Sequence, residues 1–242
     1  MRALITAAGK GTRMGGVTKY SHKGLCQIAG KSILAHAISS IRAAGVSQIY
    51  IVTGYRAELV QRTLGDAVTY LFNPFYEVSG ILGSFWQAMP VLDGKPFLFT
   101  TADHFFSAPL VRRCLEAKGD VVSLVQQKRR YDAEDSKVLI KQNRITRFGK
   151  DMPVDEAAGE YAAMTVFRSR ASAMFFAELR NVFGRGELGG YAMDILNSML
   201  DQPDLCMAHI LCDESSRIEI DSVADLRRAR RLADSIMKQS EA

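Results

Sequence analysis

Hydrophobic positions in the first half of the chain follow two periods. Short continuous apolar runs predict buried strands, and these runs lie at 3–6, 48–53, 67–72, 96–100 and 120–126. Between them, apolar residues recur every three or four positions and predict amphipathic helices over 32–44, 57–64, 84–91 and 108–117. Alternation of this kind is typical of βαβ units. We therefore predict an α/β fold, a Rossmann-like and mostly parallel sheet with helices on both faces.

The pattern changes after residue 126. A polar segment, 127–135, precedes two short strands at 137–141 and 144–148, which Gln142-Asn143 should join as a hairpin. The remaining predicted elements are a strand over 161–168, helices over 169–179 and 191–200, a strand over 205–211, an extended piece over 217–220 and a terminal helix over 223–237. No linker or repeat interrupts the chain, so we predict one domain over 1–242 that consists of two halves, 1–126 and 127–242.

Composition limits the function classes. The 242 residues carry a net charge of +5 without any block of five like charges, so we predict no nucleic-acid partner and find the charge compatible with a small anionic substrate. No apolar run approaches the roughly 18 residues of a membrane helix, and no signal-peptide pattern opens the chain. Four scattered cysteines without a Cys-x-x-Cys pair are typical of reduced thiols. We therefore expect no membrane span and a cytoplasmic location.

A glycine-rich basic loop follows the first strand, and a lysine follows the loop. The loop reads Ala7-Ala8-Gly9-Lys10-Gly11-Thr12-Arg13, and Lys23 stands in His22-Lys23-Gly24-Leu25. Such a loop can bring backbone N–H groups and positive charge to a phosphate, although Gly9 can also simply turn the chain. The order of residues excludes a P-loop, and Met14 occupies the third glycine position of a dinucleotide fingerprint.

The loop and lysine resemble the signature of the nucleotidyltransferases that make nucleotide-diphospho-sugars and nucleotide-diphospho-alcohols, the MobA-like NTP transferase superfamily. Other phrases resemble its phosphocholine and inositol-1-phosphate cytidylyltransferases: Val52-Thr53-Gly54-Tyr55, Asn73-Pro74-Phe75-Tyr76, Ala102-Asp103-His104, Ser136-Lys137-Val138, Phe148-Gly149-Lys150 and Ile218-Glu219-Ile220-Asp221. In the family a proline usually precedes this lysine, whereas in this chain His22 precedes Lys23. Lys19 is an alternative to Lys23 for the same role.

The resemblance implies the GT-A-like nucleotide-diphospho-sugar transferase fold, with nucleotide binding in 1–126 and acceptor binding in 127–242. It also implies a reaction in which an acceptor phosphate attacks the α-phosphorus of a nucleoside triphosphate and pyrophosphate leaves. A phosphate monoester has a second pKa of about 6, so the step needs charge neutralisation and alignment rather than a general base. We expect Mg²⁺ as cofactor, CTP as the favoured triphosphate, and a small phosphorylated alcohol or sugar as acceptor.

Three functions stay open at this point. The first is a cytidylyltransferase of the phosphocholine or inositol 1-phosphate class, and the second is a hexose-1-phosphate nucleotidylyltransferase that uses UTP or dTTP. The third is a catalytically silent nucleotide-binding module. A homodimer is also considered.

The same resemblance implies roles for individual residues. Arg13 would clamp the β- and γ-phosphates, and Lys23 would lie between the α-phosphate and the acceptor phosphate. Carboxylates suited to Mg²⁺ are Asp103, Glu219 and Asp221. The nucleotide would contact Ala7, Ala8, Gly9, Gly11, Thr12, Ser84 and Asp103. The acceptor would contact Lys137, Glu160, Tyr161, Tyr191 and Asp194.

Several of these residues also have a purely structural interpretation. Ser84 can be the N-cap of the helix over 84–91, and Asp103 can be an ordinary turn residue. Asp221 precedes Ser222 and can stabilise the start of the terminal helix, where Ser222 and Asp225 stand at the capping positions. Glu219 and Asp221 are two residues apart on an extended piece, so their side chains share one face.

Overall fold

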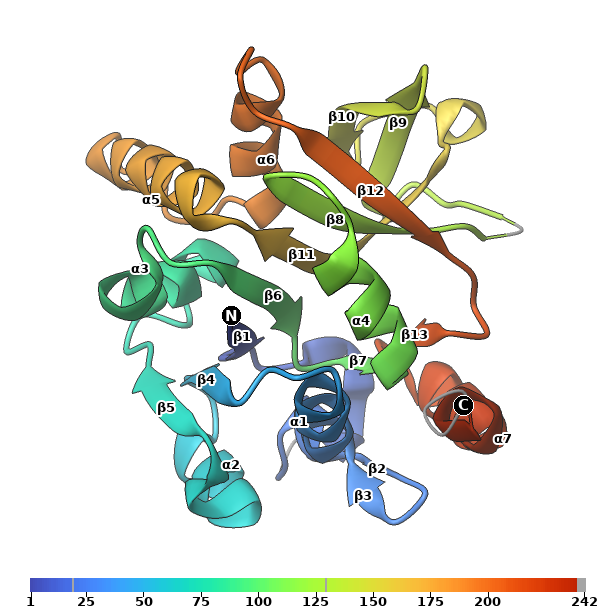
Figure 1. Cartoon of the computed structure of the whole chain (residues 1–242). Coiled ribbons are helices and arrows are strands. Elements are labelled where there is room, and N and C mark those ends of the chain that lie inside the picture. Colours follow the sequence, from blue (N-terminus) through green and yellow to red (C-terminus); the bar gives the residue numbers. More distant parts are fainter. Residues whose placement is uncertain (19, 129, 239–242) are drawn as a thin grey trace.

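A computed structural model describes residues 1–18, 20–128 and 130–238 (Figure 1). Its centre, within those residues, is a nine-stranded sheet with the order β10-β9-β11-β6-β1-β4-β5, in which β8 pairs with β11 and β12 pairs with β8. The strands are β1 Arg2–Ala7, β4 Gln48–Thr53, β5 Thr69–Phe72, β6 Phe97–Thr101, β8 Val121–Gln126, β9 Lys137–Lys141, β10 Arg144–Gly149, β11 Gly159–Phe167 and β12 Met207–Cys212.

The first half of the chain folds as the pattern predicts. Strand β1 pairs in parallel with β4 and β6, and β4 pairs in parallel with β5. The connecting helices are α1 Ile33–Ala43, α2 Ala57–Leu64, α3 Gly80–Leu92 and α4 Ala108–Glu116. Side chains of β1 point alternately to the two faces: Leu4 joins the cluster under α3, and Ile5 joins the cluster under α1 and α4. The predicted Rossmann-like sheet with helices on both faces is confirmed.

Strand β11 joins the two halves, in a way that the hydrophobic pattern did not predict. It runs antiparallel to β6 on one side and to β8 and β9 on the other, so β8 is not the neighbour of β6. The hydrophobic pattern of a strand does not show which strands it pairs with, because a buried strand is a continuous apolar run whatever its neighbours are. The β9–β10 hairpin was predicted and is confirmed, with Gln142 and Asn143 at φ of 49° and 60°.

Two helix boundaries differ from the prediction. Helix α3 begins at Gly80 with Ser79 at the N-cap, so the interpretation of Ser84 as an N-cap is wrong, and Ser84 is a buried residue inside the helix. Helix α5 (Ser169–Gly184) continues beyond the predicted end at residue 179. The two remaining helices are α6 Ala192–Leu200 and α7 Val223–Lys238. Capping of α7 by Ser222 and Asp225 is confirmed, since the Asp225 carboxylate accepts from the Ser222 backbone N–H at 2.8 Å.

A small antiparallel sheet lies beside the main one, and it too was not predicted. Strand β13 (Arg217–Glu219) pairs with β7 (His104–Phe106), and the register places Glu219 opposite His104. The Ile220 N–H then donates to the Asp103 carbonyl at 2.9 Å. Strands β2 (Gln27–Ile28) and β3 (Lys31–Ser32) form another short pair, which α7 contacts. The β7–β13 pairing places Asp103 next to Glu219 and Asp221, although the sequence separates them widely.

No helix within the described ranges combines the length and the apolar character that a membrane crossing requires.

Candidate functional site

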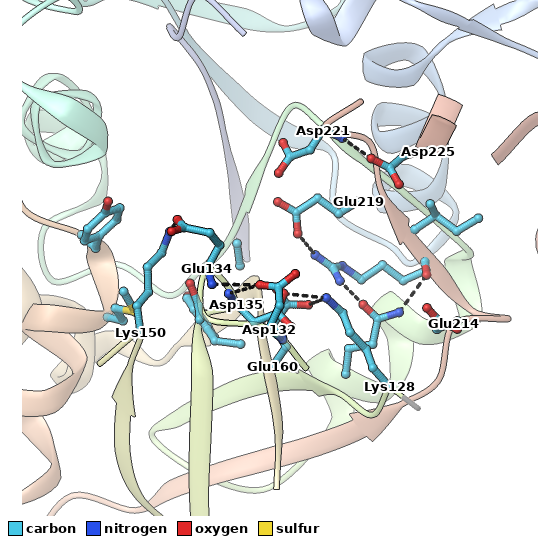
Figure 2. Close-up of a pocket in the computed structure, with 18 of the residues that line it drawn as sticks. Lys128, Asp132, Glu134, Asp135, Lys150, Glu160, Glu214, Glu219, Asp221 and Asp225 are labelled. Carbon is cyan, nitrogen blue, oxygen red and sulfur yellow. Dashed lines mark hydrogen bonds and ion pairs between the residues drawn. The ribbon is translucent and has the colours of Figure 1, made fainter. Parts of the chain in front are cut away.

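A smaller and a larger cavity lie next to each other at the carboxyl ends of β1 and β6, and Arg13 lines both. The smaller has a volume of about 270 Å³ and is enclosed by the glycine loop, the lysine segment and the end of β6. The larger, of about 520 Å³, lies between β11, residues 130–136 and the start of α7 (Figure 2). Ligands of open α/β sheets bind at this edge, so the position agrees with a substrate site.

The glycine loop is shaped around the side chain of Lys23. Gly11 has φ of +60°, and a Cβ atom on it would lie 3.0 Å from the Cβ of Lys23. A glycine is therefore required there both by the backbone conformation and by the contact. Arg13 follows on the same loop, with 71% of its side chain exposed, and its guanidinium donates to Asp221 Oδ2 at 2.8 Å.

His22 occupies the position before the lysine, where the family usually has proline, and it stabilises the turn that follows. Its Nδ1 accepts from the Gly24 N–H at 3.0 Å and so caps the short turn Lys23–Leu25. Burial lowers the pKa of His22 to about 4, which keeps the ring neutral at physiological pH. The imidazole acts here as a rigid support for the turn that carries Lys23.

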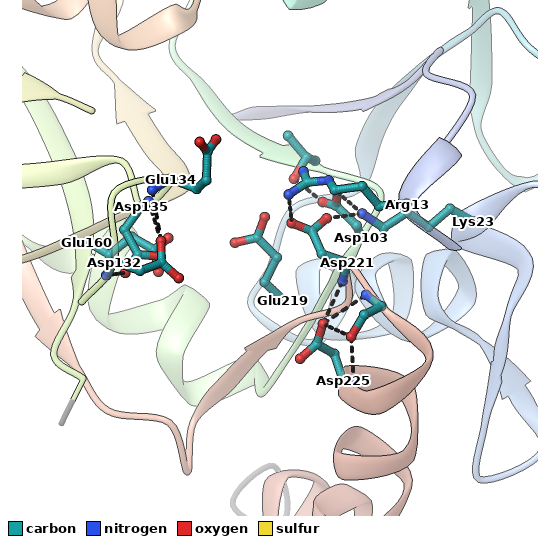
Figure 3. A network of polar contacts seen from close by, with 12 residues as sticks. Arg13, Lys23, Asp103, Asp132, Glu134, Asp135, Glu160, Glu219, Asp221 and Asp225 are labelled. Carbon is teal, nitrogen blue, oxygen red and sulfur yellow. Dashed lines mark hydrogen bonds and ion pairs between the residues drawn. The ribbon is translucent and has the colours of Figure 1, made fainter. Parts of the chain in front are cut away.

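The ammonium of Lys23 lies between two carboxylates (Figure 3). Only 11% of the side chain is exposed, and Nζ donates to Asp103 Oδ2 at 2.9 Å and also to Asp221. Burial alone would lower the pKa of Lys23, but the two carboxylates outweigh it and raise this pKa. Lys19, the alternative for this role, lies outside the described residues.

Asp103, Glu219 and Asp221 form a group that fits Mg²⁺. One carboxylate oxygen from each lies within 4.8 Å of the others. Carboxylate oxygens are the ligands that this hard cation prefers, and it commonly takes one or two of them together with substrate phosphates. Burial opposes ionisation of Asp103, yet the ammonium of Lys23 holds its pKa below the usual value. Asp103 is therefore held in the ionised form, which is the form that binds a cation.

A buried arginine, Arg217, holds Glu219 in place, and the sequence analysis did not identify it. Its guanidinium donates to Glu219 Oε2 at 2.9 Å and to His104 Nε2 at 2.8 Å, and it also contacts the amide oxygen of Gln126. Arginine in a short strand is ordinarily a solvated residue, so nothing local singles it out. The one feature of the sequence that could have identified Arg217 is its position two residues before Glu219, because residues two apart in a strand lie on the same face.

Three of the expected acceptor contacts line the larger cavity, namely Glu160, Tyr161 and Tyr191. Strand β11 has an irregular register between Tyr161 and Thr165, and Ala163, which has φ of 44° there, also lines the cavity. Burial raises the pKa of Glu160 to about 7, even though Lys128 lies beside it and also contacts Asp135 at 3.0 Å. The ammonium of Lys150 lies 5.4 Å from the centre of the Tyr191 ring.

Four residues with expected contacts are not among those that line either cavity: Lys137, Asp194, Ser84 and Ala8. Lys137 is fully buried, and its ammonium donates to three backbone carbonyls, those of Asp132, Ala133 and Asp135, at 3.1 to 3.3 Å. Burying an ammonium is costly unless it is hydrogen-bonded, and these three bonds also stabilise the turn over 132–135. Asp194 accepts from the Tyr191 N–H at the start of α6, at 2.6 Å. Ser84 is inside α3, and the Ala8 carbonyl accepts from the Tyr55 N–H.

Known proteins resemble this chain over different lengths. An N-acetylmuramate α-1-phosphate uridylyltransferase of Neisseria meningitidis is 35% identical over 43% of this chain and 47% of its own length. A bifunctional IPC transferase and DIPP synthase of Thermococcus kodakarensis is 33% identical over 62% of this chain and 34% of its own length. The chain thus spans less than half of either relative.

Among solved structures, the inositol-1-phosphate CTP transferase from T. maritima superposes with a TM-score of 0.79. The match covers 97% of this chain and 95% of that one at 23% identity, and it supports the fold described above. Residues 3–236 match the model of the MobA-like NTP transferase domain. The chain therefore belongs to the MobA-like NTP transferase family, as its sequence signature predicts.

Proposed function

We propose that the protein is a Mg²⁺-dependent nucleotidylyltransferase that joins a nucleoside triphosphate, with CTP favoured, to a small phosphorylated alcohol or sugar. The observation that carries the proposal is the position of Lys23 and Arg13. Both side chains contact Asp221, one of the three carboxylates suited to the metal. Lys23 lines the smaller cavity, and Arg13 lines both cavities. Positive charge therefore lies where the phosphates of two substrates would meet.

The proposed reaction forms one bond and breaks one. An oxygen of the acceptor phosphate attacks the α-phosphorus, the bond from α-phosphorus to the bridging oxygen breaks, and pyrophosphate leaves with the electron pair. The acceptor is largely dianionic at neutral pH, so no protein group has to remove a proton. Arg13 and Lys23 offset the negative charge that collects at the α-phosphorus and on the leaving group.

The linings of the two cavities suggest which substrate each of them binds. The glycine loop and Thr12 line the smaller cavity, where backbone N–H groups and Arg13 suit a triphosphate. The larger cavity would then hold the acceptor, with its phosphate towards Arg13 and its remainder towards Glu160 and Tyr191. Mg²⁺, when bound, would be held by Asp103, Asp221 and Glu219 and would neutralise triphosphate charge.

Within this class, the larger cavity favours a polyol or sugar phosphate over phosphocholine. A quaternary ammonium prefers an open aromatic face, but Lys150 already lies over the ring of Tyr191. Donors and acceptors alternate along the wall instead: Lys128 beside Glu160, and Lys150 at 3.7 Å from Glu134. Such pairs suit several hydroxyl groups, each of which both donates and accepts.

A hexose-1-phosphate nucleotidylyltransferase that uses UTP or dTTP is the second candidate. It is favoured by the similarity to a uridylyltransferase of N-acetylmuramate α-1-phosphate, which is a sugar phosphate. The ammonium and carboxylate groups that line the larger cavity suit the hydroxyl groups of that acceptor equally.

Pyrophosphate release separates these functions. The assay combines CTP, UTP, dTTP and ATP with phosphocholine, inositol 1-phosphate and glucose 1-phosphate, in the presence of Mg²⁺. Turnover with CTP and a phosphorylated polyol supports the proposal, and turnover only with UTP or dTTP and the hexose phosphate supports the second candidate. Tight triphosphate binding without turnover in any combination would identify a silent nucleotide-binding module and overturn both.

A further inference from the structure

The carboxylates that would hold the metal already have cationic partners from the chain itself. Lys23 Nζ lies 2.9 Å from Asp103 Oδ2 and contacts Asp221 Oδ1, while Arg13 contacts Asp221 Oδ2 at 2.8 Å. Both oxygens of Asp221 are thus committed to side-chain cations. In Figure 3, dashed lines join the ammonium of Lys23 to both aspartates and the guanidinium of Arg13 to Asp221.

An ammonium and a divalent cation compete for these oxygens. Asp103 and Asp221 belong to the group whose carboxylate oxygens lie within 4.8 Å of one another, so a cation that bridges them occupies the space that Nζ now fills. Two like charges a few ångströms apart in a half-buried site repel strongly, because little water screens them. Metal binding to these two residues therefore requires the ammonium of Lys23 to move away.

The geometry gives Lys23 a second position. Its backbone is fixed by the turn that His22 caps, and its Cβ packs under Gly11, so only the outer part of the side chain has to move. The same side chain lines the smaller cavity, where the triphosphate is proposed to bind. A phosphate there would offer the ammonium new oxygens when a metal takes the carboxylates.

We propose that Lys23 is an internal counter-ion that occupies the metal's side of the Asp103–Asp221 pair and passes to a phosphate when metal and triphosphate arrive together. This rests on the proposed function for the identity of the triphosphate. Divalent metal then binds weakly to the protein alone and much more tightly with nucleotide, because only the nucleotide provides a new partner for the displaced ammonium.

Binding of Mn²⁺ to the full chain, measured by electron paramagnetic resonance without nucleotide, tests this. Lys23→Gln should bind Mn²⁺ roughly tenfold more tightly than the wild type, since one competing charge is gone. Lys23→Arg keeps the charge and should bind Mn²⁺ as weakly as the wild type. Lys10→Gln is the matched control, because it removes the same charge from the neighbouring glycine loop, where Lys10 pairs with Glu77 and not with the aspartates.

A second measurement adds an α,β-methylene analogue of CTP. The analogue should tighten Mn²⁺ binding to the wild type by a larger factor than it does for Lys23→Gln, where no ammonium has to be relocated. Circular dichroism and a thermal transition establish that each variant is folded, and Lys23→Met replaces Lys23→Gln if that variant is not.

Equal or weaker Mn²⁺ binding by Lys23→Gln than by the wild type would overturn the inference, as would equal tightening by the analogue in both proteins. Failure of the proposed function has a different signature, which is absence of pyrophosphate release from the wild type with every substrate pair. The Mn²⁺ affinities without nucleotide do not depend on that result.

Discussion

Asp103 is the residue at which the two parts of the candidate site meet. Its carboxylate accepts from Lys23 and from the hydroxyl of Thr101, and its backbone carbonyl accepts from the Ile220 N–H. Side chain and backbone therefore have separate tasks: the carboxylate faces the cations, and the carbonyl fixes the strand that carries Glu219 and Asp221.

We expect Asp103→Asn to lower Mg²⁺-dependent turnover by about 100-fold or more, because a neutral amide neither holds the metal nor orients Lys23. The fold should survive, since the backbone hydrogen bond to Ile220 does not involve the side chain. Pyrophosphate release and a thermal transition measure both effects. Asp155→Asn, at an exposed position, is the matched control, and near-normal activity of Asp103→Asn would disprove the metal assignment.

Glu160 should make stability depend on pH. Burial raises its pKa to about 7, above the usual value of an unfolded chain, so the folded protein favours the protonated form. The stabilisation is then complete below pH about 4.5 and is lost as the pH rises from there through 7, by an amount on the order of 3 kcal/mol.

Replacement by glutamine isolates this effect. The melting temperature of Glu160→Gln minus that of the wild type should increase between pH 5 and pH 8, because glutamine has no charge to bury. A difference that stays constant over this range would show that Lys128 fully compensates the carboxylate.

The β9–β10 hairpin was predicted correctly from the sequence, but one residue of its turn has an unfavourable backbone conformation. Gln142 and Asn143 both adopt positive φ, which asparagine tolerates and glutamine does not. Gln142→Gly should therefore stabilise the protein by about 0.5–1 kcal/mol in urea unfolding. Gln61→Gly, in the exposed middle of α2, should destabilise it by about 1 kcal/mol, and a loss at both sites would contradict the assigned turn.

The glycine loop offers a second pair of opposite outcomes. An alanine at Gly11 would adopt an unfavourable φ and meet the stem of Lys23 at 3.0 Å, whereas an alanine at Gly16 would meet nothing within 4 Å. We expect Gly11→Ala to weaken triphosphate binding by about tenfold or more, measured by calorimetry, and Gly16→Ala to leave it unchanged. Equal affinities of the two variants would show that the loop does not position Lys23.

For the whole molecule, β11 decides whether the halves 1–126 and 127–242 can separate. This strand belongs to the second half, yet it pairs with β6 and β8 of the first, and one hydrophobic cluster combines Phe99 of β6 with Phe175 of α5. We therefore predict one cooperative transition in differential scanning calorimetry, with equal calorimetric and van't Hoff enthalpies. Two resolved transitions would show that the halves are independent units.

The sequence by itself determined the local structure and the identity of the key side chains. Apolar periodicity located β1, α1 and β4, because burial on a sheet or a helix face depends on nearest neighbours in the chain. The signature around Gly9, Arg13 and Lys23 determined the family, because glycine and cation at fixed spacing are needed for phosphate contact. The predicted start of α3 at Ser84 was wrong, because nothing in the local sequence distinguishes Ser84 from Ser79, which is the N-cap in the structure.

Only the tertiary structure decided which distant residues meet. The β7–β13 pairing brings Asp103 beside Asp221, β11 brings Glu160 to the larger cavity, and Arg217 becomes the support of Glu219. It also removed Lys137 from the cavity wall, because three carbonyls surround its ammonium. Contacts of this kind depend on strand order and register, and these follow from packing of the whole chain rather than from any local pattern.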